Sequence, residues 1–302
     1  MGDTRQTGLV GGSEPVLLDG GMSNALEELG HDVGDALWTA RLLRDAPEAV
    51  AEVHRRYFRA GAVVATTASY QASVPGFVDA GLDSSEAAAL VLRSVTLARR
   101  VRDEMAGDGV ERRVAASVGP YGAYLADGSE YRGRYGVTRS TLRDFHGPRL
   151  ELLLSGGPDL LAVETVPDVE EAEVLVDLLA DIDVPAWFSF SVRDGRTAAG
   201  QPLSDAFRVA AQPECVVAVG VNCLRAEEVE DAVRLAVATT GKAAIAYPNG
   251  GGEWDPATRS WVGRPGVEPT LARAWVAAGA SYVGGCCRVG PADIARLGGA
   301  LR

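Results

Sequence analysis

The sequence predicts a (β/α)8 barrel of the TIM type, and three observations lead to this fold class. Short apolar runs alternate with segments of helical spacing eight times along the 302 residues. The apolar runs lack a period-two pattern, as expected for parallel strands that are buried on both faces. Polar or small residues gather where the runs end, which is where the active sites of such barrels lie. We therefore expect one domain over residues 1–302, in which residues 1–14 form a polar leader.

A doubly wound open sheet is the alternative, because it also alternates strands and helices. Such a sheet normally carries a glycine-rich nucleotide-binding loop after a strand. Neither a G-x-G-x-x-G nor a Walker sequence follows any of the expected strands. The barrel is therefore the favoured fold.

Each expected strand is a short apolar run that stops at glycine or polar residues. The first stops at Asp19 and two glycines, and the second ends in the hydroxyls of Thr66 and Thr67. The sixth and the eighth runs both end in cysteine. The expected strands are residues 15–21, 63–67, 114–119, 160–165, 186–192, 216–223, 243–247 and 281–287.

The segments between the strands have the apolar spacing of helices. Pro47 is well tolerated in a first turn, and Gly279 is a typical helix stop. The expected helices are residues 24–30, 47–60, 85–105, 140–155, 169–179, 203–211, 226–238, 270–278 and 292–301. Residues 121–136 and 248–266 are expected to be long loops. Their aromatic residues either pack the loops or form a lid that receives a cation: Tyr121, Tyr124, Tyr131, Trp254 and Trp261.

Composition and charge narrow the class of function. Apolar residues make up 47% of the chain and aromatic residues only 6%, which indicates a core of Ala, Val and Leu. The formal charge of -12 argues against nucleic acid or an anionic membrane surface as a partner and mildly favours cationic small molecules. No signal peptide and no membrane-spanning run is recognisable, so we expect a cytoplasmic protein. The sequence makes no prediction of the oligomeric state.

Three cysteines follow strands that a barrel brings close together. Cys223 ends the sixth strand, and Cys286 and Cys287 end the eighth. We expect Gly284 and Gly285 to adopt backbone angles that turn both sulfurs of the pair toward the barrel mouth. Three thiolates with one open position are typical of a zinc site that binds a further ligand. Cys215 begins the sixth strand, about 25 Å away at roughly 3.3 Å per residue, and should be a buried structural cysteine.

Two other interpretations of the cysteines are weaker. Free cysteine is often a small core residue, but two adjacent cysteines after two glycines fill a core poorly. A redox pair is also conceivable, but adjacent cysteines form a strained disulfide and the C-x-x-C spacing is missing. A metal site is therefore the favoured interpretation.

Polar residues at the other strand ends should share the mouth with the cysteines. Asp19 and Glu164 either cap helices or, beside an anionic sulfur site, balance the ammonium group of a ligand. The three histidines lie away from the strand ends and are expected to be structural. The further strand-end residues are Thr66, Thr67, Gly119, Thr165, Ser189, Ser191, Asn222, Tyr247 and Asn249.

The expected site suits one kind of chemistry. Zinc with three thiolates is a weak Lewis acid, which disfavours hydrolysis, and its open position suits a substrate thiol, which loses its proton on coordination. The resulting anionic centre attracts a cationic methyl donor, either a sulfonium or a quaternary ammonium compound. Displacement at methyl needs in-line placement and no acid or base. The rival from another class is a zinc storage or sensor protein without catalysis, which would not need the acids Asp19 and Glu164.

Seven segments together resemble the homocysteine S-methyltransferase family, from the first strand to the last. They are Leu17-Leu-Asp-Gly-Gly21, Thr66-Thr-Ala-Ser-Tyr-Gln71, Ser117-Val-Gly-Pro-Tyr-Gly122, Val163-Glu-Thr-Val-Pro167, Gly220-Val-Asn-Cys223, Tyr247-Pro-Asn-Gly250 and Gly284-Gly-Cys-Cys287. The resemblance implies a zinc-dependent barrel enzyme that makes methionine from homocysteine.

The resemblance also implies roles for particular residues. Cys223, Cys286 and Cys287 match the zinc ligands of the family, and Asp19 and Glu164 match the acids around the homocysteine amino group. Further residues of the matching segments are expected to bind substrate: Gly20, Thr67, Asn222 and Tyr247.

The match is closest to the short stand-alone branch of the family, which uses S-methylmethionine or, less well, S-adenosylmethionine. Betaine-using members commonly have an aromatic residue directly after the strand-four acid, where this chain has Thr165. We also expect no folate and cobalamin modules, for which 302 residues leave no room beside the barrel. Within the class, the alternative is an enzyme that methylates another small thiol or a selenol such as selenocysteine.

Overall fold

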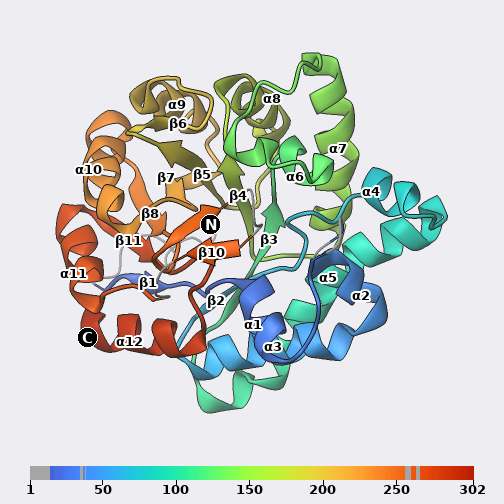
Figure 1. Ribbon diagram of the computed structural model, residues 1–302, viewed down its shortest axis with the longest axis horizontal. Helices are drawn as coiled ribbons and strands as arrows, with labels where there is room; N and C mark the ends of the chain where they lie inside the picture. Colours follow the sequence, from blue (N-terminus) through green and yellow to red (C-terminus); the bar gives the residue numbers. More distant parts are fainter. Residues whose placement is uncertain (1–13, 35–36, 38, 256–259, 263–265) are drawn as a thin grey trace, which may run out of the picture.

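Eight parallel strands form the centre of the molecule, surrounded by helices (Figure 1). The computed structural model describes residues 14–302 apart from 35–36, 38, 256–259 and 263–265, and the side chains of 253–265 are outside this description as well. Most of the expected leader, residues 1–14, therefore lies outside the described residues. The barrel strands are β1 (Val16–Leu17), β2 (Val64–Thr66), β3 (Arg113–Val118), β4 (Leu160–Val166), β5 (Ala186–Arg193), β7 (Val216–Asn222), β8 (Ala243–Tyr247) and β11 (Ala280–Val283).

The strands follow one another around the ring in the order β1-β11-β8-β7-β5-β4-β3-β2, and every pair is parallel. A parallel bridge between Leu18 and Val64 joins the two ends of this order, and the Val63 amide donates to the Leu17 carbonyl at 2.9 Å. The predicted (β/α)8 barrel is confirmed. The eight expected strands all exist, and their ends differ from the expectation by a few residues.

The helices that cover the barrel also agree with the sequence pattern. Their caps follow from short polar side chains: Asp83 accepts from the Ser85 and Glu86 amides, and Thr138 accepts from the Thr141 amide. Two short helices, α2 and α4, were not expected. The covering helices are α1 (Met22–Glu28), α2 (Thr39–Asp45), α3 (Pro47–Arg59), α4 (Val74–Asp79), α5 (Ser84–Glu104), α7 (Arg139–Ser155), α8 (Val169–Leu179), α9 (Leu203–Ala210), α10 (Val229–Thr240), α11 (Pro269–Ala278) and α12 (Pro291–Leu301).

The two expected long loops contain regular structure, so that part of the prediction is wrong. Residues 121–136 include helix α6 (Tyr121–Leu125) and the 3-10 turn η2 (Ser129–Tyr131). Residues 248–266 include the antiparallel hairpin of β9 (Glu253–Asp255) and β10 (Ser260–Val262). A further short strand, β6 (Arg196–Thr197), pairs antiparallel with β5. Elements this short contain too few residues to show a periodic pattern, so the sequence does not indicate them. Contacts with other parts of the fold stabilise them.

The inside of the barrel is packed with alternate residues of the strands. Leu160 and Ala162 of β4 and Trp187 of β5 lie in this inner cluster. The next inward position toward the carboxyl end is Glu164 on β4 and Ser189 on β5. The same alternation leads from Ala218 to Asn222 on β7 and from Ile245 to Tyr247 on β8; the apolar filling of the barrel thus gives way to polar side chains at its mouth. Among the described helices, none combines the length and the apolar character needed to cross a bilayer.

Candidate metal centre and substrate site

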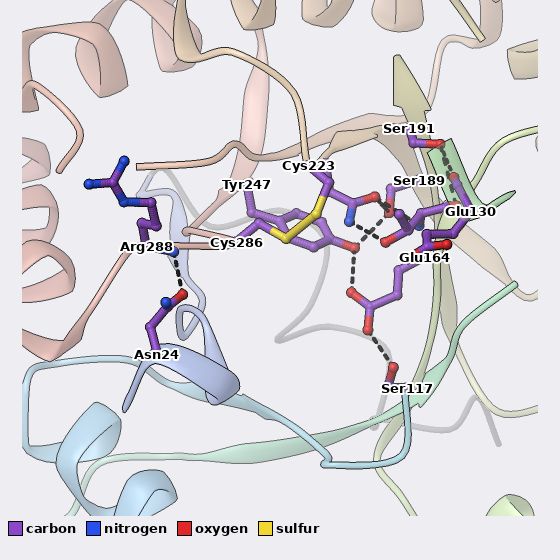
Figure 2. Close-up of a disulfide and its surroundings, with 12 residues drawn as sticks. Asn24, Ser117, Glu130, Glu164, Ser189, Ser191, Cys223, Tyr247, Cys286 and Arg288 are labelled. Atoms are coloured by element: carbon purple, nitrogen blue, oxygen red, sulfur yellow. Dashed lines mark hydrogen bonds between the residues drawn. A yellow bond between two sulfur atoms is a disulfide. The ribbon is translucent and has the colours of Figure 1, made fainter. Parts of the chain in front are cut away.

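Three cysteines meet at the carboxyl ends of β7 and β11, which are separated only by β8. The Sγ atoms of Cys223, Cys286 and Cys287 all lie within 4.8 Å of one another. In this structure, Cys223 and Cys286 form a disulfide, with their Cα atoms 5.6 Å apart (Figure 2). Cys287 is a free thiol. The expected convergence of the three sulfurs is therefore present.

The backbone around the cysteines explains how the sulfurs reach one place. Cys223 directly follows β7 with φ 53°, a left-handed conformation that is costly for a residue with a side chain. Cys286 is held by its amide, which donates to the Pro248 carbonyl at 2.8 Å, and the Cys287 carbonyl accepts from the Gly250 amide at 2.7 Å. These bonds fix the cysteine pair against the segment that follows β8.

Gly284 and Gly285 were expected to be required for their backbone angles, and this expectation is wrong. Neither glycine is in the left-handed region, and the residue with positive φ in this segment is Arg288, at 63°. Both glycines are needed for space. A Cβ on Gly284 would lie 2.6 Å from the Leu18 Cβ, and a Cβ on Gly285 would overlap the Val289 side chain.

The three sulfurs fit a metal ion that prefers thiolate ligands. A disulfide cannot supply two thiolates, so Cys223 and Cys286 must first be reduced before all three sulfurs can act as ligands. Cys215 is not part of the cluster. It lies before β7 at the other end of the barrel, where its Sγ is 3.5 Å from the Leu179 carbonyl oxygen. Cys215 is half-buried, where full burial was expected.

Tyr131 of η2 contacts the third sulfur. Its hydroxyl is hydrogen-bonded to the Cys287 thiol. Burial raises the pKa of the Cys287 thiol to about 11, and the hydrogen bond from Tyr131 opposes this rise because it favours the thiolate. The hydroxyl of Tyr131 therefore supports the anionic form that a metal ligand needs.

Glu164 is a buried carboxyl on β4, beside the cysteines (Figure 2). Ser117 Oγ donates to its Oε1, and Tyr247 Oη donates to its Oε2 at 3.1 Å. Burial raises the pKa of Glu164, while the bonds from Ser117 and Tyr247 lower it. The carboxylate is thus held on both oxygens from within the barrel, and both oxygens retain further lone pairs for a ligand.

Asn222 and Tyr247, expected to bind substrate, form part of the wall that supports Glu164. Asn222 Oδ1 accepts from the Thr165 amide and from Ser189 Oγ, each at 2.9 Å, and its Nδ2 donates to Thr165 Oγ1 at 2.7 Å. Tyr247 Oη accepts from Trp187 Nε1 at 3.1 Å and lies 2.6 Å from Ser189 Oγ. Thr165 has φ 60°, so these bonds hold a strained residue directly after Glu164.

Asp19 follows β1 and is buried, as Glu164 is. Its Oδ2 accepts from the Thr66 amide at 2.7 Å and its Oδ1 from Thr66 Oγ1 at 2.9 Å. Burial raises the pKa of Asp19 to about 7, the Thr66 bonds oppose this rise, and the charge of Glu164 adds to it. The two acids therefore interact electrostatically, and a cation beside them would relieve their repulsion.

Thr67 and Gly20 have structural surroundings. Thr67 Oγ1 accepts from the Ser117 amide at 3.0 Å and lies 2.6 Å from Ser69 Oγ, so it links the ends of β2 and β3. A Cβ on Gly20 would collide with the Val289 carbonyl oxygen and lie 3.0 Å from the Tyr57 ring. Gly20 thus allows the segment after β1 to lie against the segment that carries the cysteine pair.

Sequence reasoning missed several residues of the site. The two-residue alternation that places Glu164 inward also places Ser117 and Trp187 inward, so this signal was present. Arg149 of α7 is buried and donates to the carbonyls of Ser69, Tyr70, Ala72 and Gly119, at 2.6 to 2.9 Å. It fixes the segments after β2 and β3. No sequence pattern singles out Arg149 or Glu130. Tyr131 of η2 was expected only as one of the loop aromatics that pack a loop or form a lid, and not as a contact of the cysteines.

Comparison with known proteins identifies the family. The family model described as homocysteine S-methyltransferase matches residues 16–301, which includes all the barrel strands and the cysteine cluster. The chain belongs to the homocysteine S-methyltransferase family. Its members are methyltransferases, so the protein is an enzyme.

Two curated relatives of this family are similar over nearly their whole length. The homocysteine S-methyltransferase of Escherichia coli K12 is 44% identical over 290 residues, covering 93% of this chain and 94% of the relative. The homocysteine S-methyltransferase YbgG of Bacillus subtilis is 40% identical over 292 residues, covering 93% of each.

Solved structures of one relative are also similar. The metallated form of the homocysteine methyltransferase MmuM from E. coli superposes with a TM-score of 0.88 at 42% identity, covering 97% of this chain and 99% of that one. The oxidized form of MmuM gives the same TM-score and identity. This homocysteine S-methyltransferase family member is therefore similar to both the metallated and the oxidized forms of MmuM.

Proposed function

We propose that the protein transfers a methyl group from a sulfonium donor to the thiol of L-homocysteine, giving methionine, with zinc as its cofactor. The donor is S-methylmethionine, or less readily S-adenosylmethionine. One observation carries the proposal: three cysteine sulfurs within 4.8 Å of one another stand beside two buried carboxyls that have no cationic side chain hydrogen-bonded to them among the described residues. Membership in the family supports it.

A site with three thiolate ligands and one open coordination position favours zinc. Cys223, Cys286 and Cys287 would hold it, and when bound it would keep a substrate thiol deprotonated at neutral pH. The three cysteines are half-buried, so a small thiol can approach them. A site of free thiols requires a reducing compartment, which is why we place the protein in the cytoplasm.

Asp19 and Glu164 would bind the ammonium group of homocysteine. Each carboxylate is fixed by hydrogen bonds from its own wall of the barrel, Asp19 from Thr66 and Glu164 from Ser117 and Tyr247. Fixed anions in a buried site attract a cation more strongly than solvated ones do. The amino group would then anchor the acceptor, leaving its thiol to reach the cysteine cluster.

The transfer itself would need no acid or base from the chain. A bond forms between the acceptor sulfur and the methyl carbon, and the bond from that carbon to the donor sulfur breaks. The bonding electron pair stays on the donor sulfur, which becomes a neutral thioether, and the thiol proton passes to solvent. The chain contributes placement in line and the exclusion of water.

A methionine assay with defined donors tests this proposal. Reduced, zinc-loaded protein is incubated with homocysteine and, separately, S-methylmethionine, S-adenosylmethionine or betaine. We expect methionine from S-methylmethionine, less from S-adenosylmethionine, and none from betaine. Methionine from betaine alone would make the donor assignment wrong. No methionine from any donor would overturn the function, and selenocysteine and other small thiols would then be tested as acceptors, with the storage or sensor role as the remaining explanation.

A further inference from the structure

Glu130 is a buried carboxyl at the mouth of the barrel that the proposed function does not use. It lies in η2, which packs against β4 and β5, and its side chain and backbone are only 2% exposed. Ser191 Oγ donates to its backbone carbonyl at 3.1 Å, which fixes η2 against β5 (Figure 2). Glycine at position 122 leaves the room that this approach needs, because a Cβ there would overlap the Glu130 backbone.

The carboxylate of Glu130 differs from the other two acids of the site. Asp19 and Glu164 accept hydrogen bonds on both oxygens. The Oε2 atom of Glu130 is buried and has no hydrogen-bond partner among the described residues. A buried acceptor left unsatisfied is costly, and more so if it is charged, so such a group in a native site needs an explanation.

The surroundings of Glu130 place it next to the reacting centre. Burial is the main cause that raises its pKa to about 7. Its charge also acts on the Cys287 thiol and on the hydroxyls of Tyr70 and Tyr131. Of these, Tyr131 is hydrogen-bonded to Cys287, so the carboxyl lies one residue along the chain from a direct contact of the sulfur cluster.

Two cationic groups must enter this site during the proposed reaction. The first is the ammonium of the acceptor, for which Asp19 and Glu164 are already fixed on the barrel strands β1 and β4. The second is the positive charge of the methyl donor. An in-line displacement places the methyl carbon between the acceptor sulfur and the donor sulfur, so the donor must approach the acceptor sulfur from a direction that the cysteine cluster does not occupy. η2 belongs to the connection between β3 and α7, outside the ring of strands, and so is a segment from which a side chain can meet the donor.

We propose that Glu130 binds the cationic methyl donor, its free carboxylate oxygen balancing the donor's positive charge. This assignment rests on the proposed function. A sulfonium has no N–H to donate, so it needs a nearby anion whose attraction does not depend on a hydrogen bond, which an unpartnered carboxylate supplies. The rings of Tyr70 and Tyr131, beside Glu130, are aromatic faces of the kind that bind such cations. After the transfer the donor is a neutral thioether and the attraction ends, so the interaction acts on donor binding.

The variant E130Q tests this assignment, because it keeps the shape of the side chain and removes its charge. Zinc-loaded protein is titrated with S-methylmethionine by calorimetry without homocysteine, and the donor KM is measured at saturating homocysteine. We expect E130Q to weaken the Kd and raise the KM of the donor about tenfold to a hundredfold, as for the loss of one Coulomb attraction between unit charges in a partly desolvated site. The homocysteine Kd, the zinc content and the melting temperature should stay at the wild-type values.

A matched control is D127N, three residues earlier in the same segment. Asp127 is exposed, and its Oδ1 accepts from the Ser129 amide at 2.9 Å, a bond that asparagine can keep. We expect D127N to leave the donor KM within about twofold of wild type, because exposed charges are screened by solvent. E130D, which keeps the charge but withdraws it by one methylene, should give a donor KM between wild type and E130Q.

Three results would overturn the assignment. The first is an unchanged donor Kd and KM in folded, zinc-loaded E130Q while the wild type makes methionine; the proposed function would then stand and the role of Glu130 would be wrong. The second is a weaker homocysteine Kd with an unchanged donor KM, which would make Glu130 an acceptor residue. The third is a wild type that forms no methionine from any donor, because the proposed function and the inference would then fail together. If E130Q does not fold, an E130D variant with wild-type donor KM would be decisive against it.

Discussion

Replacing Glu164 with glutamine should weaken homocysteine binding while leaving the metal site intact. Glutamine has the same shape, and its oxygen can still accept from Ser117 or Tyr247. The hydroxyl that loses its acceptor has another partner, because Tyr247 Oη lies 2.6 Å from Ser189 Oγ. The wall of the barrel is therefore preserved, and the change is confined to the loss of one negative charge facing the substrate ammonium.

The expected size of the effect follows from the geometry. Glu164 is buried and fixed on both oxygens, so its contact with an ammonium belongs to the charge-assisted class, which contributes about 1.5–3 kcal/mol. At about 1.4 kcal/mol per factor of ten, E164Q should weaken the homocysteine Kd about tenfold to a hundredfold. Asp19 remains in the variant, so binding should be weakened and not abolished.

Calorimetry on reduced, zinc-loaded protein measures this effect, with the zinc content of each sample determined separately. A second ligand isolates the ammonium: 4-mercaptobutanoate has the thiol and the carboxylate of homocysteine but no amino group. The wild type should prefer homocysteine strongly over this analogue, and E164Q should lose most of the preference. Equal weakening of both thiols, or an unchanged homocysteine Kd, would refute the reasoning that Glu164 binds the ammonium.

Three further predictions concern the acid, the cysteines and the glycines. Burial raises the pKa of Asp19 to about 7, so its carboxyl is neutral below that pH and anionic above it. The affinity for homocysteine should therefore rise as the pH increases through 7, and D19N should lose this part of the pH profile. Identical pH profiles of D19N and wild type would contradict the role of Asp19. C286A should lose both zinc and methionine formation while C215A keeps both, since the Cys215 sulfur is outside the cluster; full turnover by metal-free C286A would refute the mechanism. G285A should lower the free energy of unfolding by about 1–3 kcal/mol and reduce the zinc content, because its Cβ would overlap Val289. The control G107A has open space around its Cβ and should change the free energy of unfolding, measured with denaturant, by less than about 0.5 kcal/mol. Equal effects of the two variants would show that the space at Gly285 is not required.

The barrel could be predicted from sequence because each of its parts has a local signal. A strand buried on both faces is a short apolar run, and a covering helix has apolar residues at helical spacing. The carboxyl ends of parallel strands face the same way, so Cys223 and the pair at Cys286 and Cys287 had to share one mouth once the barrel was inferred. The structure confirms this convergence.

What the sequence did not predict depends on contacts between distant segments. α6 forms where the Tyr121 amide donates to Glu171 Oε1 on α8, at 2.6 Å, and no pattern within 121–136 indicates this bond. The expected loop therefore hid both α6 and Glu130 of η2. Tyr131 was named as a loop or lid aromatic, but its contact with Cys287 was not predicted.

The partners of polar side chains at the mouth were also beyond sequence reasoning. Asn222 was correctly placed at a strand end, but its amide is engaged by Thr165 and Ser189 within the wall. Periodicity tells which face a residue occupies. It does not tell whether that residue meets a substrate or a neighbouring strand.

X-ray absorption at the zinc edge can show whether the three cysteines bind zinc and leave one position for the substrate thiol. Reduced, zinc-loaded protein is measured before and after addition of homocysteine, and the number of sulfur ligands at about 2.3 Å is counted. We expect three sulfurs, from Cys223, Cys286 and Cys287, without homocysteine and four with it. Fewer than three sulfurs in the first spectrum, or no added sulfur in the second, would contradict it.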